Sequence, residues 1–195
     1  MNYQLTYYNN SILRKKGEPV TEINDEIKTL VDAMITLMNK HNGIGLAAPQ
    51  ANASLRIFIM SVPIEGPDGT WEDGPLYICI NPKLSDPASK TSIRDEGCLS
   101  IPGINCPVER PIEITLEATD LNGNLFKKRF SGLEARCIMH ENDHINGVLM
   151  IDRVPKKERK AFEQKLREIK KKPTTPEEVF LNLVKKPYSQ KLFLL

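Results

Sequence analysis

The 195-residue sequence has no long apolar run, only three histidines and a single tryptophan. No stretch approaches the ~20 consecutive apolar residues that a membrane-spanning helix needs, so we expect no membrane partner. The first residues lack the charged-then-apolar layout of a secretory signal, which favours a cytoplasmic protein. In that compartment the four cysteines are expected to be free thiols or metal ligands rather than disulfides.

The net charge is small but unevenly distributed. It is +2 overall, yet residues 156–172 carry nine Lys or Arg against three Glu, and the rest of the chain is mildly acidic. We therefore expect a main domain over residues 1–155 and a basic helical extension over residues 156–195. A further short helix is expected from Thr175, where a cap residue, a proline and a capping-box glutamate follow in order.

Hydrophobic spacing predicts the elements of the main domain. Residues 24–41 form an amphipathic helix capped by Asn24 or Asp25, and His41 is expected on the surface at its end. The stretches that fit strands are 56–62, 76–80, 111–121 and 124–130, the last two joined by an Asn-Gly turn. The stretches that fit loops are 63–75 and 85–95, while 148–153 fits a short strand or turn. Strands that precede a helix without βαβ alternation indicate an α+β fold with antiparallel pairing.

A second helix is predicted over residues 131–147. Ser131 and Glu134 have the spacing of a capping box, and Gly147 stands where a helix would stop. This helix contains the most informative motif of the chain, His-Glu-Asn-Asp-His.

Two of the three histidines, His140 and His144, lie four residues apart and so share one helix face. Two imidazoles held in this way can bind one metal ion, and the adjacent Glu141 can transfer protons at a bound water. The alternative is a surface helix whose two histidines bind no metal. A metal site is favoured because so few histidines are present and two fall in this register.

A catalytic metal site needs a third protein ligand. Cys98 lies on a loop flanked by glycine and a Pro-Gly turn, so it can approach the ion from outside the helix. Cys137 lies on the metal-facing side of the helix, but three ligands from one straight helix fit tetrahedral geometry poorly. Cys137 and Leu133 better suit the wall of an apolar pocket beside the metal. The predicted metal ligands are Cys98, His140 and His144, with water in the fourth position.

Residues 43–50 read Gly-Ile-Gly-Leu-Ala-Ala-Pro-Gln. Two glycines one residue apart permit unusual backbone angles or a close approach by another chain. No strand precedes them and no lysine follows, so a phosphate-binding loop is not indicated. Two interpretations stay open: a helix-to-strand turn, or a backbone ledge lining a cleft with Gln50 as its polar group.

Three segments together resemble the motifs of peptide deformylases. They are residues 43–50, residues 96–100 (Glu-Gly-Cys-Leu-Ser) and residues 140–144, in order and at suitable spacing. Three motifs in one chain are far more specific than a lone His-Glu-x-x-His. The resemblance covers residues 5–155 and implies an α+β fold, with antiparallel sheets around a central metal-binding helix. It also implies a hydrolase that removes the formyl group from N-terminal formyl-methionine, with Fe²⁺ as the metal and Zn²⁺ or Ni²⁺ able to substitute.

The resemblance further implies roles for individual residues. Glu141 takes a proton from the attacking water and delivers it to the leaving amine. The Gln50 side chain and the Leu99 backbone N–H stabilise the developing oxyanion together with the metal. Glu96 is either a partner of a ligand histidine or a plain surface carboxylate. The residues implied in backbone pairing with the substrate and in a methionine pocket are Gly43, Ile44, Gly45, Gly97, Leu133, Cys137 and His140.

Two other functions remain possible from the sequence. A metallopeptidase with the same helix motif takes a third His or Glu ligand from downstream, but no histidine follows His144. A binding protein with a structural metal closes the fourth coordination position, with Cys137 as a candidate, and needs neither Glu141 nor Gln50.

The basic segment 156–170 carries Phe162, Leu166 and Ile169 on one face. It is either a solvated face over an apolar stripe or a surface that docks on ribosomal RNA near the exit of new chains. The resemblance implies formyl-methionine peptides of new chains as substrates, and the ribosome is a partner only under the second interpretation of this segment. No DNA partner is expected.

Overall fold

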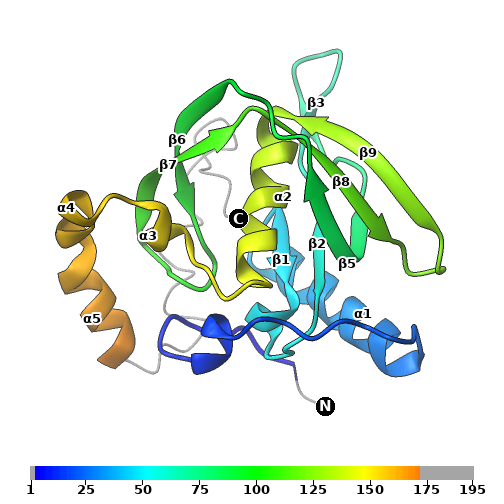
Figure 1. Ribbon diagram of the computed structural model, residues 1–195, viewed down its shortest axis with the longest axis horizontal. Coiled ribbons are helices and arrows are strands. Elements are labelled where there is room, and N and C mark those ends of the chain that lie inside the picture. The colour runs from blue at the N-terminus through cyan, green and yellow to red at the C-terminus, as the bar shows by residue number, and fades with distance from the viewer. Residues whose placement is uncertain (1–2, 172–195) are drawn as a thin grey trace.

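The computed structural model describes residues 3–171 and has an α+β architecture (Figure 1). The helices are α1 (Asp25–Lys40), α2 (Gly132–His144), α3 (Met150–Arg153), α4 (Lys156–Arg159) and α5 (Glu163–Lys171), with 3-10 turns η1 (Ser11–Arg14), η2 (Ala48–Ala51) and η3 (Lys160–Phe162). The strands are β1 (Gly45–Ala47), β2 (Ile57–Met60), β3 (Ile64–Glu65), β4 (Trp71–Glu72), β5 (Tyr77–Ser85), β6 (Thr91–Gly97), β7 (Asn105–Pro111), β8 (Glu113–Thr119) and β9 (Leu125–Ser131).

The strands form one large sheet and two ribbons. The large sheet has the order β1-β2-β5-β8-β9, and β3-β4 and β6-β7 form the ribbons. These strand pairs are all antiparallel, which confirms the predicted fold class. Helix α2 runs between the large sheet and the β6-β7 ribbon, so it lies at the centre of the molecule (Figure 1).

Helix α1 matches its prediction to within one residue at each end. The Asn24 side chain accepts a hydrogen bond from the Ile27 N–H at 3.1 Å, as expected of an N-cap. The buried face of α1 packs with η2, β1 and β2 in one hydrophobic cluster. The surface position predicted for His41 is wrong, since its side chain is buried. The chain turns back into β1 four residues later, so the end of α1 lies against the body.

Helix α2 is buried on almost every side because it has β-structure on two sides. It ends at His144, earlier than predicted, and Gly147 lies in the turn beyond it with φ +72°. The predicted capping box is wrong, because the Ser131 side chain makes no capping hydrogen bond. Ser131 still pairs with Glu113 as the last residue of β9, and Gly132, with φ +58°, turns the chain into the helix.

Three further stretches differ from their predictions. Strand β6 occupies the end of the predicted 85–95 loop, and its exposed Ile93 explains why no apolar alternation marked it. The predicted 63–75 loop contains the short β3-β4 ribbon. The 148–153 stretch contains α3 rather than a strand, with Asp152 accepting the Leu149 N–H at 2.9 Å.

The helix predicted from Thr175 lies outside the described residues, and the division at residue 155 stays a prediction. Of the basic extension, the structure describes α4, η3 and α5, which follow the proline at position 155. Within residues 3–171, no helix is long and apolar enough to cross a membrane.

Candidate metal centre

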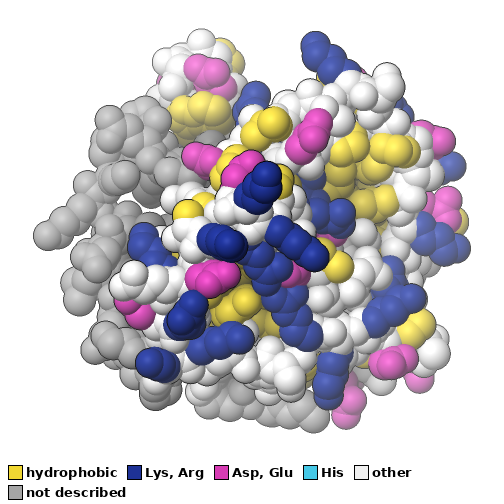
Figure 2. All heavy atoms as spheres, turned by 60° about the vertical axis from the view of Figure 1, so that its left-hand side comes forward, with side chains coloured by type: hydrophobic (Ala, Val, Ile, Leu, Met, Phe, Trp, Pro, Cys, Tyr) yellow, Lys and Arg dark blue, Asp and Glu magenta, His cyan; other side chains and the backbone are white. Residues whose placement is uncertain are grey.

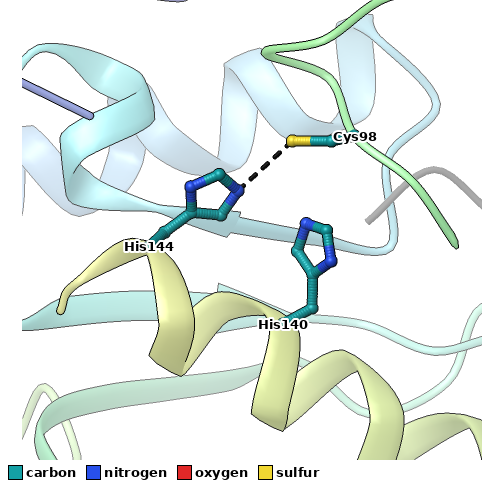
Figure 3. A group of neighbouring side chains, drawn as sticks. All are labelled: Cys98, His140 and His144. Atoms are coloured by element: carbon teal, nitrogen blue, oxygen red, sulfur yellow. Dashed lines mark hydrogen bonds between the residues drawn. The ribbon is translucent and has the colours of Figure 1, made fainter. Parts of the chain in front are cut away.

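Cys98, His140 and His144 meet in the interior. One ligand atom from each lies within 4.8 Å of the others, and all three residues are buried. Figure 3 shows the two imidazoles projecting from one side of α2 toward Cys98, which comes from a separate loop. Cys98 Sγ lies 3.2 Å from His144 Nε2. The structure thus brings together the three predicted ligands, two from a helix and one from the loop after β6.

The donor set fits a single divalent cation. His140 Nε2 is buried without a hydrogen-bond partner among the described residues, and His144 presents Nε2 toward the Cys98 thiol. Burial, together with the neighbouring His140, lowers the pKa of His144 well below its ordinary value, which favours the neutral imidazole that metals bind. Burial raises the pKa of the Cys98 thiol, and a bound cation would favour its thiolate. Thiolate and imidazole ligands suit Zn²⁺, Fe²⁺ and similar ions.

Glu96 is the buried partner of a ligand histidine rather than a surface carboxylate. Its Oε2 lies 2.9 Å from His140 Nδ1, so this nitrogen donates and the Nε2 lone pair is left for a metal. The same carboxylate accepts hydrogen bonds from Arg110 at 2.9 Å and from Arg136 at 2.8 Å. Burial alone would raise the pKa of Glu96, but hydrogen bonds from Arg110 and His140 hold it well below its ordinary value.

The buried charges extend from Glu96 to Asp143 on α2. Arg110 donates to Glu96 and also, through Nη1, to Asp143 Oδ2 at 2.7 Å. Arg153 on α3 donates to both oxygens of Asp143. Arg136 also donates to the carbonyls of Val108 and Ser92, at 2.9 and 2.8 Å. A fixed network of donors therefore orients the carboxylate that orients His140.

The sequence analysis did not identify the three arginines of this network, Arg110, Arg136 and Arg153. Arg110 lies on the buried face of β7, where buried and more exposed residues alternate. The alternation of Cys106, Val108 and Arg110 was a usable strand signal, and an arginine on a buried strand face requires a carboxylate partner.

Gln50 is fully buried beside the thiol. Its Oε1 accepts the Ala47 N–H at 2.8 Å, so the amide nitrogen faces the metal site. Nε2 lies 3.7 Å from Cys98 Sγ and 3.3 Å from Ser100 Oγ. In residues 43–50 the chain passes from the turn after α1 into β1 at Gly45 and on into η2, as the helix-to-strand interpretation expects, and the ledge lining a cleft stays a prediction.

Glu141 is fully buried next to β1. Neither of its carboxylate oxygens has a hydrogen-bond partner among the described residues. Burial raises the pKa of Glu141 well above its ordinary value, and the charge of Glu96 adds to the shift. A Cβ on Gly45 would lie 2.5 Å from Glu141 Oε1 and 2.7 Å from Cys137 Sγ. Only glycine leaves room here for the carboxylate and the thiol.

The predicted substrate residues gather around these groups. Ile44 and Cys137 are buried in one hydrophobic cluster, and Leu133 packs against it. Leu99 follows the Cys98 ligand, and a Cβ on Gly43 would lie 2.8 Å from Leu99 Cδ1. The remaining one, Gly97, is the last residue of β6 and is buried.

An α+β fold with a His-Glu-x-x-His helix at its centre and a loop thiol as third ligand defines a class of metal-dependent hydrolases. The comparisons narrow the class, because the family model of polypeptide deformylase matches residues 2–160. A peptide deformylase from Chlorobium luteolum is 38% identical over 162 residues, which cover 83% of each chain. The chain belongs to the peptide deformylase family.

Two solved structures agree with this assignment. The plant peptide deformylase PDF1B is 34% identical, with a TM-score of 0.78 over 87% of this chain and 89% of that one. A class I type b peptide deformylase from Acinetobacter baumannii, solved with Met-Ala-Ser bound, is 29% identical, with a TM-score of 0.72 over 79% and 99%. The protein is therefore an enzyme that removes the N-terminal formyl group, and the metallopeptidase and binding-protein readings are set aside.

Proposed function

We propose that Cys98, His140 and His144 hold one divalent ion and that Glu141 moves the proton in hydrolysis of the formyl amide. The observation that carries the proposal is the buried Glu141 carboxylate, without a partner in the described part of the chain, one residue from a metal ligand. An ion held by these residues supplies Lewis acidity, which makes water a stronger acid and polarises a carbonyl oxygen.

Glu141 is suited to act first as a base and then as an acid. Burial raises the pKa of Glu141 above its ordinary value, which makes its carboxylate a stronger base toward water. It accepts a proton from the attacking water as the C–O bond to the formyl carbon forms. It then delivers that proton to the amine nitrogen as the C–N bond breaks, releasing formate.

Gln50 and Leu99 stabilise the negative charge that develops on the formyl oxygen. The Gln50 amide is held with Nε2 toward Cys98, because Ala47 N–H occupies its oxygen. The Leu99 backbone N–H is a second donor beside the ligand thiol. Preorganised donors of this kind contribute about 10²–10³-fold each to the rate of acyl transfer.

The peptide binds as an extended strand along β1. The backbones of Gly43, Ile44, Gly45 and Gly97 pair with it, as an added strand pairs with a sheet edge. The methionine side chain enters the pocket lined by Ile44, Leu133, Cys137 and His140. The relative from Acinetobacter baumannii, solved with Met-Ala-Ser, supports a methionine-first peptide as the ligand class.

In the cell the metal is Fe²⁺, and Zn²⁺ or Ni²⁺ can replace it. One thiolate with two imidazoles accepts each of these ions, so supply and catalytic rate decide among them. The test is metal analysis of protein purified without oxygen, paired with formate release by the metal-free protein after loading each ion. Highest activity with Zn²⁺, or iron absent from the purified protein, would overturn the assignment.

The partner proposed for α4 and α5 is the ribosome, and the proposed site of action is the cytoplasm. Figure 2 looks onto this side and shows lysine and arginine side chains gathered there, with acidic ones interspersed. Leu166 is buried and Phe162 and Ile169 pack against the body, so the apolar stripe faces inward and the charges outward. Arg167→Glu should weaken co-sedimentation with ribosomes while Lys83→Glu, on β5, does not, and added salt should abolish the binding.

Formate release from a formyl-Met peptide tests the central assignment. Glu141→Gln should keep one metal per chain and lose at least about 10³-fold in kcat, because the proton acceptor is gone. Glu134→Gln, on the same helix but half-exposed, is the matched control and should remain active. Activity of Glu141→Gln near the wild-type level would refute the role of this carboxylate.

A further inference from the structure

We propose that the N-terminal strap, residues 5–8, positions the two segments that carry Gln50 and Cys98 for catalysis. The strap contains none of the three sequence motifs. The inference rests on the proposed roles of Gln50 and Cys98, and it assigns the strap a positioning function rather than a chemical one.

Thr6 binds the Gln50 segment twice. Its N–H donates to the Gln50 carbonyl at 2.7 Å, and its Oγ1 donates to the Pro49 carbonyl at 2.9 Å. Thr6 and Gln50 are both buried. The Pro49 carbonyl also accepts the Asn52 N–H at 3.2 Å within the same turn. Of the two hydrogen bonds that the Pro49 carbonyl accepts, the one from the Thr6 hydroxyl is thus the shorter, and it comes from outside η2.

Tyr8, two residues further, binds the other segment. Its N–H donates to the Ser100 carbonyl at 2.9 Å, next to the loop that carries Cys98 and Leu99. Ser100 Oγ in turn lies 3.3 Å from Gln50 Nε2. Hydrogen bonds therefore connect the strap, η2 and the Cys98 loop in a closed ring around the Gln50 amide, which we propose to stabilise the oxyanion.

Side-chain packing fixes the strap in place. Leu5 is buried in the same cluster as Ala48, Ala51 and Leu99, on the Gln50 side. Tyr8 packs against the cluster that contains Cys98, and Arg14 and Lys170 lie over its ring at 5.6 and 5.2 Å. The strap thus contacts two hydrophobic clusters, one that contains Ala48 and Ala51 of η2 and one that contains Cys98.

Replacing the Thr6 hydroxyl with a methyl group removes this bond and adds a steric conflict. A methyl carbon requires more than the 2.9 Å that now separates Oγ1 from the Pro49 oxygen, so the strap and η2 must move apart. Since Gln50 follows Pro49 directly, the separation displaces its amide from Cys98. Serine keeps the hydroxyl and should preserve the contact.

The first test compares Thr6→Val with Thr6→Ser by formate release with metal content verified. A displaced oxyanion donor loses part of its about 10²–10³-fold contribution, so we expect Thr6→Val to lower kcat at least about fivefold with KM within about twofold. Thr6→Ser should restore kcat. Thr29→Val is the control, because Thr29 Oγ1 makes the same kind of bond, to the Asp25 carbonyl at 2.8 Å, on the remote and exposed side of α1.

The second test is independent of turnover. Amide hydrogen exchange of the metal-loaded protein should accelerate in Thr6→Val within residues 45–52 and 97–104, and remain unchanged within α1. Unchanged exchange and kcat in Thr6→Val, or an equal loss in Thr29→Val, would overturn the proposal. If the wild-type protein released no formate, the proposed function would fall, whereas the exchange result would still decide whether the strap holds these segments.

Discussion

His140 Nδ1 lies 2.9 Å from Glu96 Oε2, and that carboxylate accepts further hydrogen bonds from Arg110 and Arg136. One buried anion therefore sets the orientation and tautomer of a metal ligand while two cations hold the anion. The arrangement makes ligand geometry depend on three separate elements, since Glu96 lies on β6, Arg110 on β7 and Arg136 on α2.

Glu96→Gln should weaken metal binding by about 10–100-fold. The neutral amide accepts a weaker hydrogen bond from His140 Nδ1 than the charged carboxylate does, so it orients the imidazole less firmly. Competition with a chromophoric chelator measures the affinity. Glu109→Gln on the exposed side of the same ribbon is the control. Equal affinity in the two variants would show that the Glu96 charge does not tune the site.

Acid should destabilise the metal-free protein partly through Glu96. The pKa of Glu96 in the folded protein lies well below the ordinary 4.5, so the unfolded chain binds a proton that the folded chain does not. Its stabilising contribution is complete above pH 4.5 and is lost progressively as the pH falls below it. Urea unfolding at a series of pH values from neutral downward measures the free energy of unfolding. In Glu96→Gln this free energy should be lower at neutral pH and should fall less steeply with acid than in the wild-type protein. An unchanged slope would contradict the depressed pKa.

Cys98→Ser should lose the bound metal, because a serine hydroxyl is a poor ligand for these ions and two imidazoles remain. Cys106→Ser is the matched control, since Cys106 is also buried and lies in the same hydrophobic cluster without facing the histidines. Metal per chain, measured by atomic emission, should be near zero in the first variant and near one in the second. Full metal content in Cys98→Ser would contradict Cys98 as the third ligand and would favour a ligand downstream of the helix.

Gly45→Ala should impair catalysis while leaving the ligands intact. The new Cβ would lie 2.5 Å from Glu141 Oε1, so the carboxylate must rotate away, and misplacement by about 1 Å can cost about 10²-fold in rate. Gly66→Ala is the control, because its nearest contacts would be 3.3 Å away in the β3-β4 region. Formate release with metal content verified gives the comparison, and a kcat equal to that of Gly66→Ala would refute the proposed crowding.

Several elements were predicted correctly for local reasons. The α1 helix follows from apolar residues at helical spacing and from the Asn24 cap. The β8-β9 hairpin follows from apolar alternation over residues 111–121 and the Asn-Gly turn that comes after it. Strand β6 was missed because it exposes Ile93 and several charged residues, so neither of its own faces shows an apolar pattern.

The amino-acid sequence by itself determined the metal-binding helix, since His140, Glu141 and His144 share a face through helix geometry alone, and three short motifs determined the family. Tertiary structure alone decided that Glu96 is buried under Arg110 and Arg136, that His41 lies inside, and that Thr6 and Tyr8 tie two catalytic segments together. The physical reason is how far apart in the sequence the interacting residues lie. Helix periodicity acts over four residues, whereas the Glu96–Arg136, Thr6–Gln50 and Tyr8–Ser100 contacts join segments at least 40 residues apart in the sequence.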